Sequence, residues 1–341
     1  LHKLLLDDLG VNQIAAVIGA SMGGMLVLEW AYFGKTFIRC IVPIATSSRQ
    51  GAWGISWGEV QRQSIFADPK YKDGFYKFSD PPSTGLGAAR MSALLMYRSH
   101  SSLERRFGRK TLEMSRKVTL SEKLSASLDE AHFQTHNDGH NTKSSHQKAS
   151  PSNVQSELQE NSTSDSTDPR FEDTCNSPSN LSQLVEVKNS GPTDFSVQSY
   201  LRYQGSKFVK RFDANCYISL TRKMDTHDVS RKRSHSITDA LSLIEQPALV
   251  IGIESDGLFP ISEQIELVSG IPNARLERIG SMEGHDAFLL QLDQVNQLIL
   301  NFLLDVIPEF YESSTNLVTK GPETEFIYEE DVTKVSEVVC M

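Results

Sequence analysis

A serine framed by glycines near the start of the sequence has the setting of a nucleophile. Gly19-Ala20-Ser21-Met22-Gly23 matches the pattern G-x-S-x-G, with an apolar run at 14–18 before it and a helix-forming run at 25–31 after it. A sharp turn from a strand into a helix exposes the serine hydroxyl and brings it beside helix amides that can stabilise an oxyanion. We predict that Ser21 is a nucleophile and that the backbone N–H of Met22 is an oxyanion donor. A packing turn or a phosphate-binding loop is the alternative, and no lysine stands at the Walker position that the second requires.

A serine nucleophile requires a base, and the base requires a carboxylate that orients it. Asp256 follows the apolar run 248–253, at the edge where the loops of a parallel sheet converge. His285 follows after the length of one helix and one strand. The order serine, acid, histidine is the one found in enzymes with this type of turn. We therefore predict a catalytic triad of Ser21, Asp256 and His285.

Other residues compete for two of these roles. Glu254 stands close to Asp256 and is the alternative acid. His227 is the alternative base, although it precedes the acid and has no strand before it. Asp256 also begins an Asp-Gly dipeptide, which is typical of turns, and His285 could cap the helix that follows it. Each residue alone therefore has a structural explanation, and the triad depends on their combination.

The hydrophobic pattern along the chain predicts the α/β class. Leucines at helical spacing in 1–9, stopped by Gly10, precede the strand at 14–18 and the helix at 25–31, which is the order of a unit of a parallel sheet. Further runs predict strands at 40–45, 248–253 and 275–279, and helices at 86–97, 262–269 and 287–304. Such a sheet collects the carboxyl ends of its strands, and the residues that follow them, at one edge.

Composition excludes several functions. The net charge of −9 disfavours nucleic-acid binding, which needs a dense basic surface. The four cysteines form no CxxC pair, so neither a metal site nor a disulfide framework is indicated. No apolar run has the length of a membrane span, and the N-terminus lacks the pattern of a signal peptide. Together with the free thiols, this predicts a cytoplasmic location and no membrane contact.

Two segments are too polar to form a core. The composition changes sharply at 136–194, and within 144–167 aliphatic residues are almost missing. Such a segment cannot bury enough apolar surface to offset the entropy lost on ordering, and we predict a disordered insertion. The polar and acidic stretch 313–341 is predicted to be a tail.

Eight motifs, in order, resemble those of the homoserine O-acetyltransferases of the α/β-hydrolase superfamily, in particular the fungal type, which also carries a polar insertion. They lie at 19–25, 89–98, 106–109, 199–205, 211–217, 225–228, 255–260 and 284–289, and the resemblance covers about residues 1–125 and 195–310. It implies an α/β-hydrolase fold with a mostly parallel sheet and a helical lid. The implied parts are a partial core at 1–50, a lid at 51–135, the insertion at 136–194, a lid return at 195–235, a C-terminal core at 236–312 and the tail at 313–341.

The resemblance also implies a reaction. Ser21 would take an acetyl group from acetyl-CoA, a co-substrate rather than a bound cofactor, and pass it to the hydroxyl of L-homoserine. The family binds the amino-acid end of homoserine through residues that match Arg90, Tyr97 and Asp286, since an arginine can hold a carboxylate and an aspartate can pair with an ammonium group. Without the resemblance, Arg90 in a structural ion pair and Tyr97 in the core would be the preferred interpretations. Related enzymes are commonly dimers, which implies a homodimer.

In two places the sequence departs from this family. Ala20 stands where many members have glycine, and because both are small we expect the turn to survive. In this fold the nucleophile follows the fifth strand, yet the chain begins at Leu1, shortly before Ser21. The first four strands and the loop with the second oxyanion donor would precede Leu1. We expect a fragment that is inactive or unstable by itself, because losing one such donor costs about 10²- to 10³-fold in kcat.

Alternative functions stay open at this point. The donor could be succinyl-CoA, and the acceptor could be L-serine or the alcohol of a specialised metabolite such as a deacetyl-cephalosporin. A hydrolase would pass the same acyl group to water. A homologue without activity could use the polar insertion to contact a partner.

Overall fold

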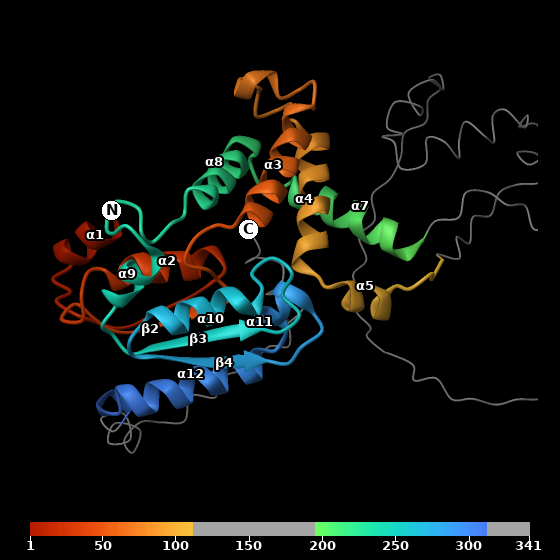
Figure 1. Ribbon diagram of the computed structural model, residues 1–341. Coiled ribbons are helices and arrows are strands. Elements are labelled where there is room, and N and C mark those ends of the chain that lie inside the picture. The colour runs from red at the N-terminus through yellow and green to blue at the C-terminus, as the bar shows by residue number, and fades with distance from the viewer. Residues whose placement is uncertain (112–194, 312–341) are drawn as a thin grey trace, which may run out of the picture. The chain divides into compact units, whose positions relative to one another are not determined.

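The computed structural model describes residues 1–111 and 195–311 (Figure 1). The predicted insertion at 136–194 and the predicted tail at 313–341 lie outside these residues, and so does the end of the predicted lid, 112–135.

Four parallel strands form one sheet in the order β1 (Ile14–Ala20), β2 (Ile38–Ile44), β3 (Ala248–Ile253) and β4 (Ala274–Ile279). All four strands were predicted within two residues at their ends, because each is a short apolar run bounded by turn residues. The parallel register brings the carboxyl ends of the strands to one edge of the sheet, and the segments that follow β1, β3 and β4 carry Ser21, Asp256 and His285. The predicted α/β class with a parallel sheet is confirmed.

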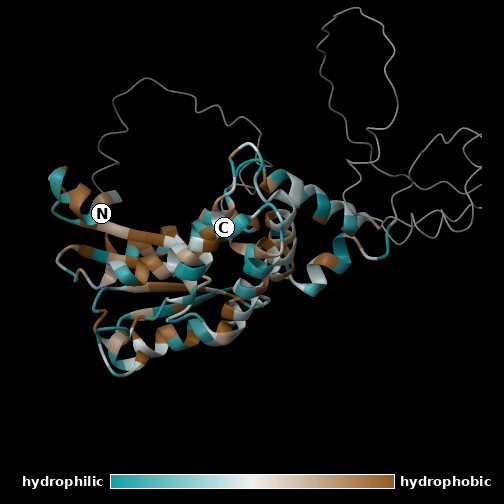
Figure 2. Ribbon diagram, turned by 90° about the horizontal axis from the view of Figure 1, so that it is seen from above, coloured by the Kyte–Doolittle hydropathy of each residue, from teal (hydrophilic) through white to brown (hydrophobic). Residues whose placement is uncertain are grey.

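Helices cover both faces of the sheet, so β3 is buried throughout and β2 is buried at every residue except Arg39. One face packs against α2 (Met22–Ala31), α9 (Ile237–Ser242) and α10 (Ile261–Gly270) through a core that contains Leu28, Val250 and Leu267. The other face packs against α11 (Ala287–Leu290) and α12 (Leu292–Val306), with Phe302 fully buried. Alternate residues of β3 point to the two cores, as strand geometry requires. Seen from above, hydrophobic residues concentrate in the strands between the helices (Figure 2).

A layer of helices stands over the carboxyl edge of the sheet, and we call it the lid. It comprises α3 (Ala52–Phe66), α4 (Ser83–Tyr97), α5 (His100–Arg106), α7 (Ser196–Phe208) and α8 (Ala214–Asp225), with the short 3-10 turn η1 (Lys72–Gly74) (Figure 1). Glycines allow close helix contacts: a Cβ at Gly205 would lie 3.0 Å from the carbonyl oxygen of Gly87, so α4 and α7 touch through their backbones. An antiparallel bridge between Thr111 and Phe195 joins the two ends of chain that border the region outside the description.

The predicted helix at 287–304 is in fact two helices, and this prediction was wrong. Gln291 has φ −107° and ψ 48°, outside the helical region, and the axes of the two helical stretches differ by 73°. The break lets the 3-10 turn η3 (Gly284–Asp286) and α11 hold His285 at the sheet edge while α12 runs back along the sheet. Amphipathic periodicity continues through the break, and therefore the sequence pattern did not reveal it.

The start of the described chain is less buried than the rest of the core. The helix α1 (His2–Asp8), predicted from its leucine spacing, buries no residue, and β1 is only partly covered, with Ile18 45% exposed. Within the described ranges, no single helix is long and apolar enough to cross a membrane, although the bent pair Gly284–Leu290 and Leu292–Val306 meets the criteria of length and composition.

Candidate active site

Ser21 sits on a strained turn between β1 and α2. Its φ of 56° and ψ of −123° are costly for a residue with a Cβ atom, and such strain occurs mostly where function needs it. The flanking small residues make the turn sterically possible. A Cβ at Gly19 would lie 2.5 Å from the carbonyl oxygen of Gly23, and a Cβ at Gly24 would lie 2.6 Å from Cβ of Thr46. Close packing therefore explains the first glycine of the G-x-S-x-G pattern and the adjacent Gly24, whereas a Cβ at Gly23 would meet nothing within 4 Å.

The backbone of Ser21 is held from the neighbouring strand. Its N–H donates to the carbonyl oxygen of Ile44 at 2.9 Å, and its carbonyl oxygen accepts from Thr46 Oγ1 at 2.8 Å. Ser21 caps the N-terminus of α2, where the first amide N–H groups of a helix have no partner within the helix. The predicted role of the Met22 N–H as an oxyanion donor agrees with this location and stays a prediction.

Asp256 and His285 form a buried acid–base pair. Asp256 Oδ2 lies 2.7 Å from His285 Nδ1, and Asp256 Oδ1 accepts from the backbone N–H groups of Leu258 at 2.8 Å and Phe259 at 2.9 Å. Asp256 is 5% exposed to solvent, and His285 is 2% exposed. Because the carboxylate can only accept, Nδ1 carries the proton, and Nε2 is left as the acceptor that a general base requires.

The surroundings of His285 set its proton affinity. Burial by itself lowers the pKa of His285, but the charge and the hydrogen bond of Asp256, with the charge of Asp286, outweigh burial and raise that pKa. The rings of Phe259, Phe288 and Tyr97 lie 5.4 to 5.9 Å from the imidazole, centroid to centroid. A fixed carboxylate in a buried site therefore stabilises the charged imidazolium form of His285.

The two competing residues have other surroundings. Glu254 is exposed, whereas Asp256 is buried. His227 Nε2 lies 2.9 Å from the carbonyl oxygen of Ser47, and burial lowers the pKa of this histidine. His227 thus fixes the loop after β2, and the geometry favours Asp256 and His285 over both alternatives.

Tyr97 connects the acid–base pair to Arg90. Both residues lie on the buried face of α4. The guanidinium carbon of Arg90 is 5.6 Å from the ring centroid of Tyr97 and 4.9 Å from that of Phe208. Asp286, buried beside His285, pairs with Arg98 through Nε at 3.2 Å. The structure thus gathers the three predicted substrate-binding residues around His285, and their roles stay predictions.

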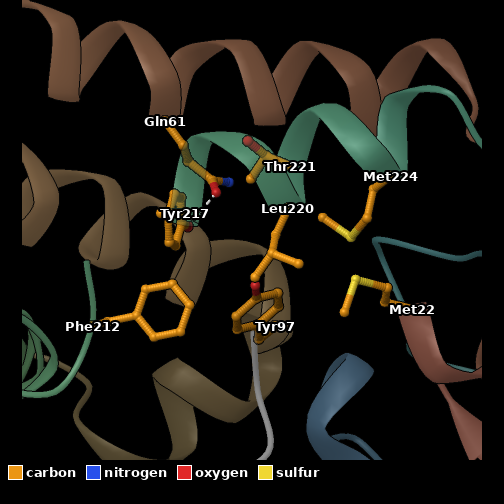
Figure 3. Close-up of a pocket in the computed structure, with 8 residues that line it drawn as sticks. All are labelled: Met22, Gln61, Tyr97, Phe212, Tyr217, Leu220, Thr221 and Met224. Carbon is orange, nitrogen blue, oxygen red and sulfur yellow. Dashed lines mark hydrogen bonds between the residues drawn. The ribbon is translucent and has the colours of Figure 1, made fainter. Parts of the chain in front are cut away.

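A narrow pocket links the serine turn to the lid (Figure 3). Met22 from α2 and Tyr97 from α4 line it together with side chains of α8, which include Tyr217, Leu220 and Met224. Tyr217 donates a hydrogen bond to Gln61 Oε1 at 2.5 Å. The free volume of this pocket is about 20 Å³. An acyl group can therefore enter the pocket only if side chains of α8 move. Sequence reasoning did not identify Gln61, Tyr217 or the α8 residues, although 211–217 was one of the motifs of the resemblance.

Among the hydrogen bonds of residues 1–111 and 195–311, none joins Ser21 Oγ to His285 Nε2. The approach of these two atoms is the part of the triad that stays predicted. A larger hollow of about 410 Å³, lined by Glu29 and the run Arg231, Lys232 and Arg233, lies at the opposite end of α2 from Ser21. It is lined by none of the candidate catalytic residues, so we do not assign it as the catalytic site. In the part of the chain that the structure describes, no group of three or more His, Cys, Asp or Glu side chains could hold a metal ion.

A second carboxyl near the site should make folding stability depend on pH. Burial, then the charges of Glu266 and Asp256, raise the pKa of Glu263 to about 7. Protonation of Glu263 therefore favours the folded state, and this contribution is complete below its ordinary pKa of 4.5 and disappears as the pH rises through about 7. We expect Glu263→Gln to raise the melting temperature at about pH 8 and to leave it nearly unchanged at about pH 5. Thermal unfolding followed by circular dichroism checks this, and an equal shift at both values would contradict it.

Comparisons with known proteins agree with this geometry. A family model described as the alpha/beta hydrolase fold matches residues 1–291. Among solved structures, a homoserine O-acetyltransferase from Bacillus anthracis superposes with a TM-score of 0.59 at 17% identity, covering 89% of this chain and 63% of the other. Esterase E22 superposes with a TM-score of 0.60 at 18% identity, covering 89% of this chain and 64% of the other. At these identities the structures show the fold alone.

The sequence relatives are more similar. A homoserine O-acetyltransferase of Emericella nidulans is 55% identical over 324 residues, which is 91% of this chain and 64% of the relative. One from Schizosaccharomyces pombe is 47% identical over 348 residues, 98% of this chain and 71% of the relative. The chain thus spans slightly less than two thirds of the Emericella relative. It belongs to the homoserine O-acetyltransferase family of the α/β-hydrolase fold.

Proposed function

We propose that this protein transfers an acetyl group from acetyl-CoA to the hydroxyl of L-homoserine through an acetyl-serine intermediate on Ser21. The observation that carries the proposal is the buried hydrogen bond between His285 Nδ1 and Asp256 Oδ2, at the same sheet edge as a strained serine. The Emericella and Schizosaccharomyces relatives are named homoserine O-acetyltransferases, which supports acetyl as the transferred group and homoserine as the acceptor.

In the first half-reaction, Ser21 Oγ attacks the thioester carbonyl while His285 Nε2 accepts the hydroxyl proton. The carbonyl oxygen gains negative charge, and the Met22 N–H at the start of α2 stabilises it. The C–S bond then breaks, and the protonated His285 returns the proton to the departing thiolate. Asp256 keeps the imidazole in the required tautomer and stabilises its charged form.

In the second half-reaction, His285 removes the proton from the homoserine hydroxyl, whose oxygen attacks the acetyl-serine. Collapse of the tetrahedral intermediate breaks the bond to Ser21 Oγ, which recovers the proton from His285. Arg90 binds the carboxylate of homoserine with Tyr97 beside it, and Asp286 binds the ammonium group. Because Asp286 already pairs with Arg98, the substrate ammonium shares this carboxylate with a guanidinium.

A thiol-release assay tests the reaction. With the protein expressed from its complete coding sequence, we expect coenzyme A to appear from acetyl-CoA only when L-homoserine is added, and not at all from a Ser21→Ala variant. The Emericella relative, assayed alongside, is the positive control. Release without homoserine would indicate a hydrolase instead, and L-serine, succinyl-CoA and a deacetyl-cephalosporin in place of the two substrates test the other acyl-transfer alternatives. A folded protein that stays silent while the Emericella control is active would contradict the proposal.

Arg90→Ala should raise the KM for homoserine by about 10- to 100-fold, because a charge-assisted hydrogen bond to a carboxylate contributes roughly 1.5–3 kcal/mol. The KM for acetyl-CoA should change little. Arg90→Lys is the matched control, because it keeps the positive charge but loses the bidentate geometry of the guanidinium. Its KM for homoserine should lie between that of the original protein and that of Arg90→Ala. Steady-state kinetics with each substrate varied in turn provide the measurement. An equal rise in both KM values would argue against a homoserine-specific role.

We further propose that the protein acts as a homodimer, as the resemblance to its family implies, and that it is located in the cytoplasm, as its free thiols indicate. Analytical ultracentrifugation of the purified protein and fractionation of the source cells test the two parts.

A further inference from the structure

Gln264 on α10 is a fully buried side chain that the mechanism above does not use. It is 0% exposed. Its amide nitrogen Nε2 donates to two backbone carbonyl oxygens, that of Thr46 at 2.7 Å and that of Phe259 at 3.3 Å. One planar amide group therefore contacts two loops that are far apart in sequence.

Each of these loops contacts one part of the candidate triad. Thr46 follows β2, and its Oγ1 donates to the carbonyl oxygen of Ser21 at 2.8 Å. Phe259 follows β3, its N–H donates to Asp256 Oδ1 at 2.9 Å, and its ring lies 5.5 Å from the His285 imidazole. A chain of short contacts thus runs from Ser21 through Thr46, Gln264 and Phe259 to the acid–base pair.

The strained backbone at Ser21 needs support of the kind that this series of contacts provides. A serine at φ 56° keeps its conformation only where neighbouring groups determine it, and the Thr46 hydroxyl is one such group. A displacement of about 1 Å between reacting groups can cost about 100-fold in rate. The Ser21 turn and the Asp256–His285 pair follow different strands, so their relative placement depends on what joins the two loops.

Burial alone does not explain a glutamine at this position. In the described chain its Oε1 is buried without a hydrogen-bond partner, and it packs beside Gly252, where a Cβ would lie 3.3 Å from Oε1. An unsatisfied buried acceptor reduces stability. The favourable part of the side chain is its amide N–H₂ group, which is the part that joins the two loops.

We propose that Gln264 is a positioning residue that keeps the Ser21 turn in register with the Asp256–His285 pair, so that Ser21 Oγ reaches His285 Nε2. The proposal rests on the triad and does not depend on which acyl donor or acceptor the protein uses.

The chain contains a matched control for this role. Gln246 is also buried, at 1% exposure, and its Nε2 donates to the carbonyl oxygen of Ala31 at 2.6 Å. Its Oε1 likewise has no partner within the described residues. Gln246 precedes β3, so it lies at the amino end of the strand, away from the catalytic edge. Replacing either glutamine with methionine removes the same type of hydrogen bond at nearly constant volume.

The experiment measures the rate at which a fluorophosphonate probe labels Ser21, together with the melting temperature. This probe reports an activated serine and needs neither acetyl-CoA nor homoserine. We expect Gln264→Met to slow labelling by about 10- to 100-fold. We expect Gln246→Met to lower the melting temperature by a similar amount as Gln264→Met but to change the labelling rate less than about twofold.

A second pair of variants tests the same link if Gln264→Met does not fold. Thr46→Val removes only the hydroxyl that donates to Ser21, and Thr46→Ser retains it. Labelling should be slow in the valine variant and close to the original rate in the serine variant. Equal slowing in the two glutamine variants, or an unchanged rate in Gln264→Met or in Thr46→Val, would overturn the positioning role. A wrong choice of acyl acceptor would leave these rates unaffected, so the two proposals fail separately.

Discussion

Ser21→Ala should lower kcat by about 10⁴- to 10⁶-fold, because the acyl-enzyme can no longer form and only binding and oxyanion stabilisation remain. The fold should persist, since alanine keeps the backbone contacts of Ser21 to Ile44 and Thr46. Thiol release from acetyl-CoA, corrected for the uncatalysed rate, gives the loss in kcat. A variant that retains more than about one hundredth of the activity would remove Ser21 from the mechanism.

Ser21→Gly is the matched control for the strain at this turn. Both variants lack the nucleophile, but glycine has no Cβ atom and adopts φ 56° without strain. Relief of about 1–3 kcal/mol, less the entropy that glycine loses on folding, should leave the glycine variant about 1 kcal/mol more stable than the alanine variant. Urea denaturation measures the difference. A glycine variant less stable than the alanine variant would contradict the idea that stability is sacrificed at Ser21 for function.

Asp256→Asn should reduce kcat by about 10⁴-fold, because asparagine can donate to Nδ1 and thereby stabilise the wrong imidazole tautomer. It should also lower the pKa of His285. Burial, which lowers that pKa, remains in the variant, whereas the opposing charge of Asp256 is gone. Titration of the His285 ring protons by NMR should give a pKa above the ordinary 6.5 in the original protein and below it in the variant. Glu254→Gln, which alters the exposed alternative acid, should change neither quantity.

The raised pKa of His285 acts in opposite directions on stability and activity. The folded protein holds the proton more tightly than the unfolded chain, so protonation stabilises the fold at pH values below about 6.5, and this contribution disappears as the pH rises through the higher folded pKa. Catalysis needs the neutral base, so kcat/KM should rise over that same interval. An acid limb of kcat/KM that lies below pH 6.5 would contradict the raised pKa.

The positions of the three candidate catalytic residues at the sheet edge were predictable because each depends on local sequence. The turn at Ser21 needs small residues between a strand and a helix, and this requirement is written in five adjacent positions. Asp256 and His285 follow apolar strands in the order that parallel topology dictates. Burial distinguishes Asp256 from the alternative acid Glu254. Burial alternates along the end of a strand, and only the structure resolves it.

Residues that act across loops could not be predicted in this way. Gln264 lies within an amphipathic helix, where a glutamine usually indicates a solvated position, and its two carbonyl partners come from segments with no pattern in common. Tyr217 and Gln61 meet only because α8 packs on α3. The break at Gln291 depends on how α12 returns along the sheet. In each case the deciding interaction is a tertiary contact, and a local sequence pattern does not reveal it.

The bridge between Thr111 and Phe195 has an evolutionary consequence. The bridge joins two ends of the lid, whose helices α4 and α7 are also in backbone contact. The lid alone therefore holds Thr111 and Phe195 next to each other. Because the bridge holds Thr111 beside Phe195, the contact of α4 with α7 does not depend on how many residues lie between those two positions. An evolutionary change in chain length between them would therefore leave the lid contacts in place.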